Sequence, residues 1–409
     1  MSNETTTRRD PDVAVVGGGL GGLAAAATVA RAGRSVAVYE RLGAFGGQAR
    51  SVTRDDFTFN NGPHALYLGG AAERVLTDLG VELRGGRPPV KGRVVFDDRA
   101  EIAPAGPGTL LRSGALSPAD KLQIAKVLYR LPKLDAAEFA AMTVDEWIAS
   151  VVTRTRPTVL LRAIIRLATY VNQPDQLSAD VAITQLQAAL GPGVLYLDGG
   201  WQSLVDQLAA TPGIQFVSGE GPTTVPTAPA VIVATGGPAT AGALLDRSYE
   251  VGPPARVSGI DYGLTRRPVT DVVIGGDRPF YFSNHSAAAT LSPDGCFHAA
   301  AVQYLATGDQ PDPDAIDRFA RHAGVRREDV AVRRQLRELV PVTAIPTAST
   351  GGMAGRPPVT DTGRDNTFLV GDWVGSEGHL ADAVLASAAT AAQLALDVVD
   401  RATSRTSAA

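Results

Sequence analysis

The stretch of residues 13–40, VAVVGGGLGGLAAAATVARAGRSVAVYE, holds five glycines within six consecutive positions. An apolar run precedes the glycines, and an alanine-rich run follows them. A second apolar run then ends on one acidic residue, Glu40. We interpret Val13–Val16 as a buried parallel strand, residues 23–32 as a helix and residues 35–39 as a second strand. The stretch therefore predicts a strand–turn–helix–strand unit of an α/β protein.

The glycines fit the spacing G-x-G-x-x-G at Gly17, Gly19 and Gly22, and Glu40 follows Gly22 by 18 residues. The first glycine permits a tight turn, the second lets backbone approach a pyrophosphate, and the third lets the helix pack closely on the strand. The helix N-terminus offers N–H groups to phosphates, and Glu40 can accept hydrogen bonds from ribose hydroxyls. The unit predicts dinucleotide binding, with a ligand-free glycine turn as the alternative, and does not separate NAD from FAD.

Composition narrows the class of protein. The chain has 409 residues, a net charge of −4, 44% hydrophobic residues and one cysteine, Cys296. One cysteine excludes an internal disulfide and a cysteine metal cluster, so we expect no metal site and a cytoplasmic location. The negative charge argues against a nucleic-acid partner. Glycines interrupt the apolar residues 13–30, so we infer no signal peptide, and no other stretch reaches the ~18 apolar residues of a membrane span.

A second informative segment lies near the C-terminus, NTFLVGDWVGSEGHLADAVLASAATAAQLAL at residues 366–396. We expect a strand at residues 367–370, a turn at Gly371 and Asp372, and a helix from His379 or Leu380 onward. The segment resembles the second flavin signature of the superfamily of FAD-dependent amine oxidases, protoporphyrinogen oxidases and phytoene desaturases. The resemblance implies that Asp372 hydrogen-bonds the ribityl–pyrophosphate region of FAD. It also implies that the helix start near residues 380–383 stabilises negative charge at the flavin N1–C2=O edge.

Two segments after the first unit resemble the same superfamily. GAFGGQARSV, residues 43–52, matches a G-G-R motif except that Gln48 replaces the arginine, and Arg50 or Arg41 is the alternative phosphate contact. FNNGPHALY, residues 59–67, matches an F-D-x-G-P-H segment with Asn60 in place of the acid. In the superfamily this segment leads from the FAD domain to the flavin ring.

Two further fragments follow in the order that the superfamily has. YLDGGWQSLVDQLA, residues 196–209, resembles a loop and helix between the two domains, and AVIVATGG, residues 230–237, is the strand that re-enters the nucleotide sheet. Between them the usual three-stranded meander must be shortened, which leaves open an adenine contact from Val217 or Val225. The resemblance covers residues 11–400.

The resemblance implies an α/β fold with a discontinuous Rossmann-type FAD-binding domain, like that of glutathione reductase, and a substrate domain of mixed sheet with a helical cap. We assign residues 11–85, 194–240 and 346–409 to the FAD-binding domain. We assign residues 86–193 and 241–345 to the substrate domain, with the cap at about 117–190. The lysine-rich stretch at 121–134 fits a solvated helix with a buried stripe, and weak contact with a membrane surface is the alternative.

The candidate residues fall into three sets. The residues expected to bind FAD are Gly17, Gly19, Leu20, Gly22, Glu40, Arg41, Gly46, Gly47, Gln48, Ala49, Gly62, Pro63, Val217, Thr235, Gly236, Gly371, Asp372, Leu380, Ala381 and Ala383. Those expected in the substrate pocket are Tyr67, Tyr170, Asn172, Trp201, Tyr281, His285 and Trp373. His64 is the candidate catalytic base or positioning residue, with a loop-fixing histidine as the alternative. We expect no catalytic role for His298, His322 or Cys296.

The predicted function is that of an FAD-dependent oxidoreductase, closest to phytoene dehydrogenase-like proteins. It would remove a hydride from a largely apolar small molecule such as a terpenoid or another secondary metabolite. A non-redox flavin isomerase and a non-catalytic escort protein on the same fold are the alternatives. No second G-x-G-x-x-G follows a strand, so oxygen or a quinone-like molecule is the expected electron acceptor. The sequence leaves the oligomeric state open.

Overall fold

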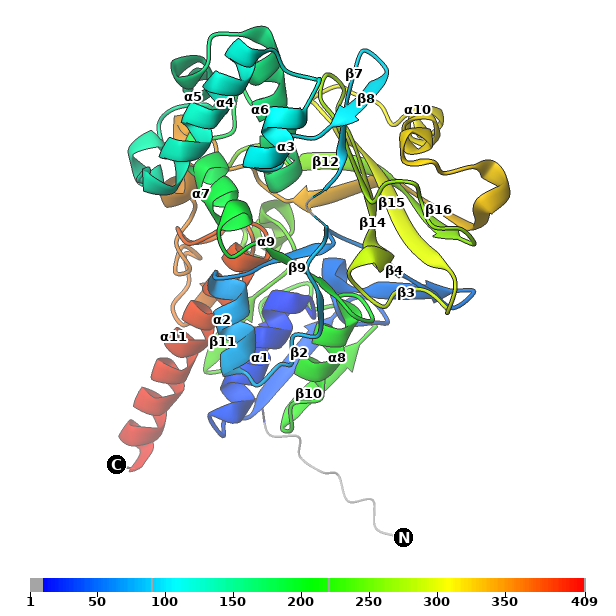
Figure 1. Cartoon of the computed structure of the whole chain (residues 1–409). Helices are drawn as coiled ribbons and strands as arrows, with labels where there is room; N and C mark the ends of the chain where they lie inside the picture. The colour runs from blue at the N-terminus through cyan, green and yellow to red at the C-terminus, as the bar shows by residue number, and fades with distance from the viewer. Residues whose placement is uncertain (1–9, 90, 220, 408–409) are drawn as a thin grey trace.

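The computed structural model describes residues 10–407 except 90 and 220, with side chains up to Ser404. It divides into three regions, which Figure 1 shows. A parallel sheet with α1 (Leu20–Arg31) and α11 (Ala381–Ser407) forms the lower half, a larger mixed sheet lies at the upper right, and a group of helices lies at the upper left. This arrangement confirms the α/β fold class expected from the sequence.

The parallel sheet joins segments from three distant parts of the chain. Its order is β10 (Ile214–Ser218), β2 (Val36–Glu40), β1 (Val13–Val16), β11 (Ala230–Val233) and β17 (Thr367–Leu369), and every neighbouring pair is parallel. The two strands β1 and β11 are buried throughout because helices cover both faces of the sheet. Residues 221–229, after β10, form no strand, so no meander stands between β10 and β11. The domain boundaries drawn from the sequence stay a prediction.

Small residues bring α1 close to its neighbours. The helix begins at Leu20, three residues earlier than expected, so Gly21 and Gly22 belong to its first turn. A Cβ atom on Gly21 would lie 2.7 Å from Val370 and 2.8 Å from Val384, which shows how tightly α1 packs against α11. The helix α2 (Ala71–Asp78) also packs against α11.

The helix α11 differs from the sequence expectation about membrane spans. Residues 381–404 are long and apolar enough to cross a membrane by length and composition. Of their most apolar window, 56% is buried inside the protein, where α11 contacts α1, α2 and β11. Such burial is typical of the core helix of a folded domain.

The mixed sheet supplies the wall opposite the nucleotide region. Its order is β16 (Val330–Val342), β12 (Ala255–Leu264), β15 (Phe297–Leu305), β14 (Phe280–Asn284), β13 (Val272–Gly275), β7 (Arg93–Phe96) and β8 (Arg99–Ile102). All neighbours are antiparallel except β13 and β7. The short helix α10 (Pro313–Ala320) packs on β12 and β15. The mixed sheet expected for the substrate side is therefore present.

The cap consists of α3 (Pro107–Arg112), α4 (Pro118–Arg130), α5 (Val144–Val151), α6 (Thr155–Thr169) and α7 (Ala179–Leu190). Capping boxes at Ser117 and Thr143 begin α4 and α5, as their sequences indicate. The lysine-rich helix α4 buries Ile124 and Val127 and exposes Leu122 and Tyr129. It thus has the expected buried stripe.

Two small sheets connect these regions. One pairs β3 (Ser51–Arg54) with β4 (Phe57–Asn60), and the other orders β5 (Ala65–Tyr67), β9 (Val194–Leu197) and β6 (Gly85–Gly86). The helices α8 (Gln202–Ala209) and α9 (Pro238–Leu245) follow β9 and β11. The loop that leaves β4 and the loop that leaves β9 thereby meet beside the first glycine turn.

The close contact at Gly22 gives a test of the fold. A Cβ atom there would lie 1.9 Å from the carbonyl oxygen of Gly17, a backbone atom that cannot move without opening the turn. We expect Gly22→Ala to lower the free energy of unfolding of the FAD-free protein by about 1–3 kcal/mol, measured by urea denaturation. Gly43→Ala is the matched control because no atom lies within 4 Å of its added Cβ. Equal stability of the two variants would contradict the contact.

Candidate active site

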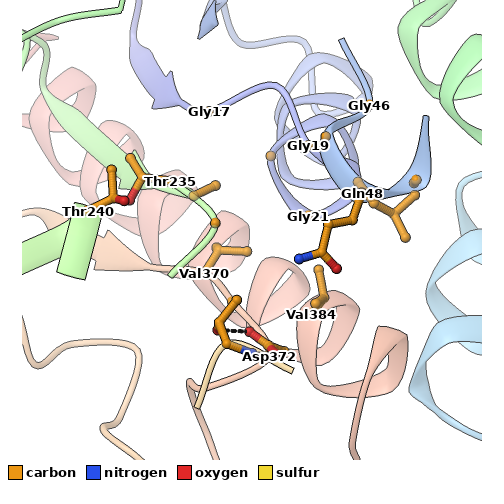
Figure 2. A pocket seen from close by; sticks show the side chains of 18 of the residues that line it. Gly17, Gly19, Gly21, Gly46, Gln48, Thr235, Thr240, Val370, Asp372 and Val384 are labelled. Atoms are coloured by element: carbon orange, nitrogen blue, oxygen red, sulfur yellow. Dashed lines mark hydrogen bonds between the residues drawn. The ribbon is translucent and has the colours of Figure 1, made fainter. Parts of the chain in front are cut away.

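A cavity of about 570 Å³ lies where the parallel sheet meets α1 and α11. Its wall contains the glycine turn after β1, the end of β2, the segment of residues 46–49 and the first turn of α11. Figure 2 shows Gly17, Gly19, Thr235 and Asp372 around this space, with Gln48 extending into it. The carboxyl ends of β1, β11 and β17 all open onto the cavity, as in other open α/β sheets that bind ligands.

Glu40 organises the turn at one end of the cavity. Its Oε2 accepts a hydrogen bond from the Gly18 N–H (2.8 Å), and its Oε1 accepts one from the Leu42 N–H (2.8 Å). A carboxylate has about four acceptor positions, so two remain for hydroxyl groups of a ligand. The side chain lines the cavity, which suits it to hold the ribose of an adenosine.

Asp372 lies at the other end, beside α11. Its carboxylate accepts hydrogen bonds from the Thr343 N–H (2.6 Å) and from the Thr343 hydroxyl. Burial raises the pKa of Asp372, while the Thr343 hydrogen bonds act in the opposite direction. Arg356 donates to the Asp372 carbonyl oxygen (3.0 Å) and to that of Gly378 (2.9 Å), which fixes the turn that precedes α11.

The start of α11 faces the cavity with Leu380, Ala381, Asp382 and Val384. Ala383, which we expected there, is fully buried and does not line the cavity. Asp382 accepts a hydrogen bond from the Ala72 N–H (2.7 Å), and burial raises the pKa of Asp382. The N–H groups of this first turn, of which that of Asp382 donates to the His379 carbonyl oxygen (3.2 Å), give partial positive charge at the cavity wall.

Two observations show that the cavity fits an extended phosphate-bearing group. The Thr235 hydroxyl is buried in the wall and has no hydrogen-bond partner among the described residues. At Gly19 an added Cβ atom would meet nothing within 4 Å, so the backbone there faces open space. Backbone N–H groups at a helix N-terminus and an unpaired hydroxyl are donors of the kind that a dinucleotide pyrophosphate accepts.

Most of the residues expected to bind FAD line this cavity. They are Gly17, Gly19, Leu20, Gly22, Glu40, Arg41, Gly46, Gly47, Gln48, Ala49, Pro63, Thr235, Gly236, Gly371, Asp372, Leu380 and Ala381, joined by Tyr67 and Trp201. Gly62, Val217 and Ala383 are not among the lining residues. The sequence did not predict Thr343, Pro341 and His379 as lining residues. Residues 221–223 line the cavity, whereas the sequence predicted a contact from Val217.

A second cavity of about 60 Å³ adjoins the first, and Gln48, Pro63 and Pro341 line both. Its wall is largely apolar and comes from β12, β15 and β16. His64 and Tyr170 lie here, as expected for the substrate side. The Gln48 amide nitrogen donates to the Val340 carbonyl oxygen (2.8 Å), so its side chain stands at the junction of the two cavities.

Four residues expected in the substrate pocket line neither cavity. Asn172 donates to the Tyr304 carbonyl oxygen, and the Tyr281 hydroxyl lies 3.4 Å from the Tyr196 hydroxyl. Trp373 turns away from the flavin site and packs against Tyr249. His285 lies behind His64, with ring centroids 3.8 Å apart. The place of these four residues in a substrate pocket therefore stays a prediction.

His64 is half-buried and held in an uncharged state. Burial lowers its pKa to about 4, with Asp261 opposing the shift and with His298 and Arg334 adding to it. Its Nδ1 lies 3.1 Å from the Asn60 amide nitrogen. At neutral pH the ring is therefore a neutral imidazole at the wall of the second cavity.

The glycine turn, the acid at the end of β2 and the helix start beside Asp372 together define a nucleotide-binding flavoprotein with an adjoining substrate cavity. Comparison with known families agrees: the profile of the flavin containing amine oxidoreductase family matches residues 20–298. The chain belongs to this family, and FAD is its cofactor.

The individual relatives match this chain only over a short segment or at low sequence identity. The segment that matches phytoene desaturase of Cercospora nicotianae is 36% identical over 78 residues, which is 19% of this chain and 13% of that protein. An oxidoreductase from Methanosarcina mazei has a similar structure, with a TM-score of 0.70 and 17% identity over 93% of this chain and 99% of that one. Cyclohexylamine oxidase from Brevibacterium oxydans IH-35A also has a TM-score of 0.70, with 15% identity over 95% and 99%. These structures share the fold.

Glu40 gives a test of the nucleotide end. In Glu40→Gln one amide nitrogen would face a backbone N–H that now donates to the carboxylate, so the turn and the ribose contact are both weakened. We expect the dissociation constant of FAD to rise about 10- to 100-fold, measured by quenching of flavin fluorescence on titrating the apoprotein. Glu138→Gln, on the exposed surface of the cap, is the matched control. An unchanged dissociation constant for Glu40→Gln would rule out this role.

His379 gives a pH prediction. Its Nε2 donates to the Thr169 carbonyl oxygen (2.9 Å), and burial lowers its pKa to about 4 from 6.5. Between these values the unfolded chain binds a proton that the folded protein does not. The residue therefore lowers the free energy of unfolding as pH falls from 6.5 towards 4, by about 1.4 kcal/mol per pH unit.

We expect His379→Gln to reduce this pH dependence by about one proton, since glutamine can still donate to Thr169 without titrating. Urea denaturation at several pH values between about 7 and 5 measures the effect. His322→Gln, which alters a partly exposed histidine outside both cavities, is the control. Identical slopes in the wild type and His379→Gln would contradict the buried neutral state.

Proposed function

We propose that this family member is a dehydrogenase: a hydride leaves a C–H bond of a largely apolar small molecule, a proton leaves the neighbouring carbon or nitrogen to solvent, and a C=C or C=N double bond remains. The supporting observation is the junction of the two cavities at Gln48, Pro63 and Pro341. A substrate in the second cavity would meet the cofactor cavity there, between strands that exclude water. FAD, when bound, supplies the hydride acceptor.

The residues of this chain have separate tasks in the proposal. Glu40 and the glycine turn hold the nucleotide end of FAD, and Asp372 with Thr343 holds the ribityl–pyrophosphate region. The N–H groups at the start of α11 stabilise negative charge on the reduced cofactor. Apolar side chains of β12, β15 and β16 keep the reacting carbon away from water.

The size of the second cavity bears on the substrate class. Pockets for small ligands commonly have about 300–1,000 Å³, whereas this cavity has about 60 Å³. A long carotenoid of the kind named for the phytoene desaturase relative is much larger than this space. We therefore propose a smaller terpenoid or another secondary metabolite, of which only the reacting part enters the cavity. Oxygen or a quinone-like molecule is the proposed electron acceptor.

Anaerobic mixing of the FAD-loaded protein with a probe panel tests this proposal. The panel contains phytoene, the shorter isoprenoids farnesol and geranylgeraniol, and cyclohexylamine. We expect bleaching of the visible flavin band with a short isoprenoid and formation of a product with one more double bond, found by mass spectrometry. Cyclohexylamine should leave the band unchanged.

Other outcomes would overturn the proposal in recognisable ways. Bleaching by cyclohexylamine alone would indicate an amine oxidase. Conversion of a probe to an isomer with no loss of hydrogen would indicate a non-redox isomerase. A colourless protein that cannot be loaded with FAD would indicate an escort protein. Failure of every isoprenoid to bleach a flavin that dithionite reduces would contradict the substrate class.

A further inference from the structure

Asn60, at the end of β4, contacts three groups from different segments. Its Oδ1 accepts hydrogen bonds from the Trp201 N–H (3.0 Å) and from the Ser51 hydroxyl (2.7 Å). Its amide nitrogen lies 3.1 Å from His64 Nδ1. The Asn60 side chain is buried, and these three contacts are the hydrogen bonds that it makes with the described residues.

The orientation of this amide follows from the Trp201 contact. A backbone N–H can only donate, so the atom of Asn60 that faces Trp201 must be the oxygen. The amide nitrogen therefore faces His64, and because an amide NH₂ only donates, His64 Nδ1 must accept. In a neutral imidazole the proton then lies on Nε2.

The second ring nitrogen of His64 is free to meet a ligand. Among the described residues, Nε2 of His64 has no hydrogen-bond partner. It is also absent from the fully buried polar atoms that lack a partner, so it is accessible from outside the protein interior. His64 lines the second cavity. An N–H group that is accessible, unpaired and set in a largely apolar wall is suited to an acceptor atom on a bound molecule.

The surroundings keep His64 from acquiring a charge. Arg334 on β16 pairs with Asp261 on β12 at 3.2 Å, so the carboxylate of Asp261, which lines the same cavity, already has a cationic partner. His298 on β15 lies 3.7 Å from the same Asp261, and His285 packs against the His64 ring. Tyr170, from the end of α6, also lines this cavity and carries no charge near neutral pH.

We propose that Asn60 fixes His64 as the neutral tautomer with its proton on Nε2, and that His64 positions the substrate by donating this hydrogen bond to an oxygen atom of it. His64 is then a donor rather than a general base. The substrate class becomes an apolar molecule with a hydroxyl, carbonyl or ether oxygen near the carbon that reacts. The tautomer is independent of the proposed function, whereas the oxygen contact rests on it.

Nitrogen-15 NMR of the histidine rings tests the tautomer without any substrate. The chain has five histidines, so specific labelling gives few signals, and His64→Gln identifies the His64 signals by their loss. We expect the full-length protein, with and without FAD, to show His64 with a protonated Nε2 and an unprotonated Nδ1 at neutral pH. A protonated Nδ1, or a charged ring, would overturn the assignment.

Substitution of Asn60 by an acid gives a second test of the His64 tautomer. In Asn60→Asp the carboxylate can still accept from Trp201 but can only accept from His64, so Nδ1 must carry a proton. We expect the tautomer to reverse or the ring to become charged. Asn61→Asp, at the neighbouring residue whose Oδ1 accepts from Arg334, is the control and should keep the proton on Nε2. A wild-type tautomer in Asn60→Asp would also count against the proposal.

Matched ligands test the oxygen contact on FAD-loaded protein. Perturbation of the flavin spectrum reports binding of farnesol and of farnesene, an isoprenoid of the same carbon number without oxygen. We expect His64→Leu to weaken farnesol binding about three- to tenfold and to leave farnesene binding unchanged. Equal loss for both probes would reduce His64 to a packing role. If both probes bind but neither is dehydrogenated, the proposed function fails, whereas the tautomer, which is measured without substrate, stands.

Discussion

The close packing of α1 against α11 is the constraint on which the site depends. Gly21 leaves space for Val370 and Val384, and no larger residue fits without moving them. This contact brings two helix N-termini, separated by more than 350 residues of sequence, to the wall of one cavity. One helix start lies at the glycine turn and the other beside Asp372, so a dinucleotide can meet partial positive charge at two separate points.

Buried ionisable groups in this protein are either paired with polar or charged partners or held in their neutral form. Arg356 is surrounded by the carbonyl oxygens of Asp372 and Gly378, and burial lowers its pKa to about 10. Arg334 pairs with Asp261, which lines the second cavity. The histidines that line the two cavities, His64 and His379, stay neutral because burial disfavours their charged forms. The result is a cofactor cavity with polar ends and a substrate cavity without net charge.

The sequence predicts those parts of the site that local patterns encode. The glycine spacing, Glu40 and the turn at Asp372 each lie within one strand–turn–helix unit, so their positions follow from that unit. Thr343 and Pro341 carry no such pattern, because they reach the cavity only through the end of β16. The sequence VAVRRQLRELVPV of β16 mixes arginines with apolar residues, as an edge strand with one exposed face does.

Side-chain direction was harder to predict than position along the chain. Trp373 follows Asp372 directly, yet its ring packs against Tyr249 with a centroid distance of 4.8 Å. His285 and Tyr281 both contact Tyr196, and neither lines the second cavity. A layer of buried side chains depends on how two sheets face each other, which no local pattern records.

The last turn of α6 joins the cap to the cofactor region. Helix C-termini leave carbonyl groups without partners in the helix, and those of Ala168 and Thr169 are buried. The Tyr67 hydroxyl donates to Ala168 at 2.9 Å, and His379, just before α11, donates to Thr169 at 2.9 Å. Both donors also line the cofactor cavity. Movement of the cap away from the cofactor would break both hydrogen bonds, so the geometry of the substrate side is tied to the helix start that faces the flavin.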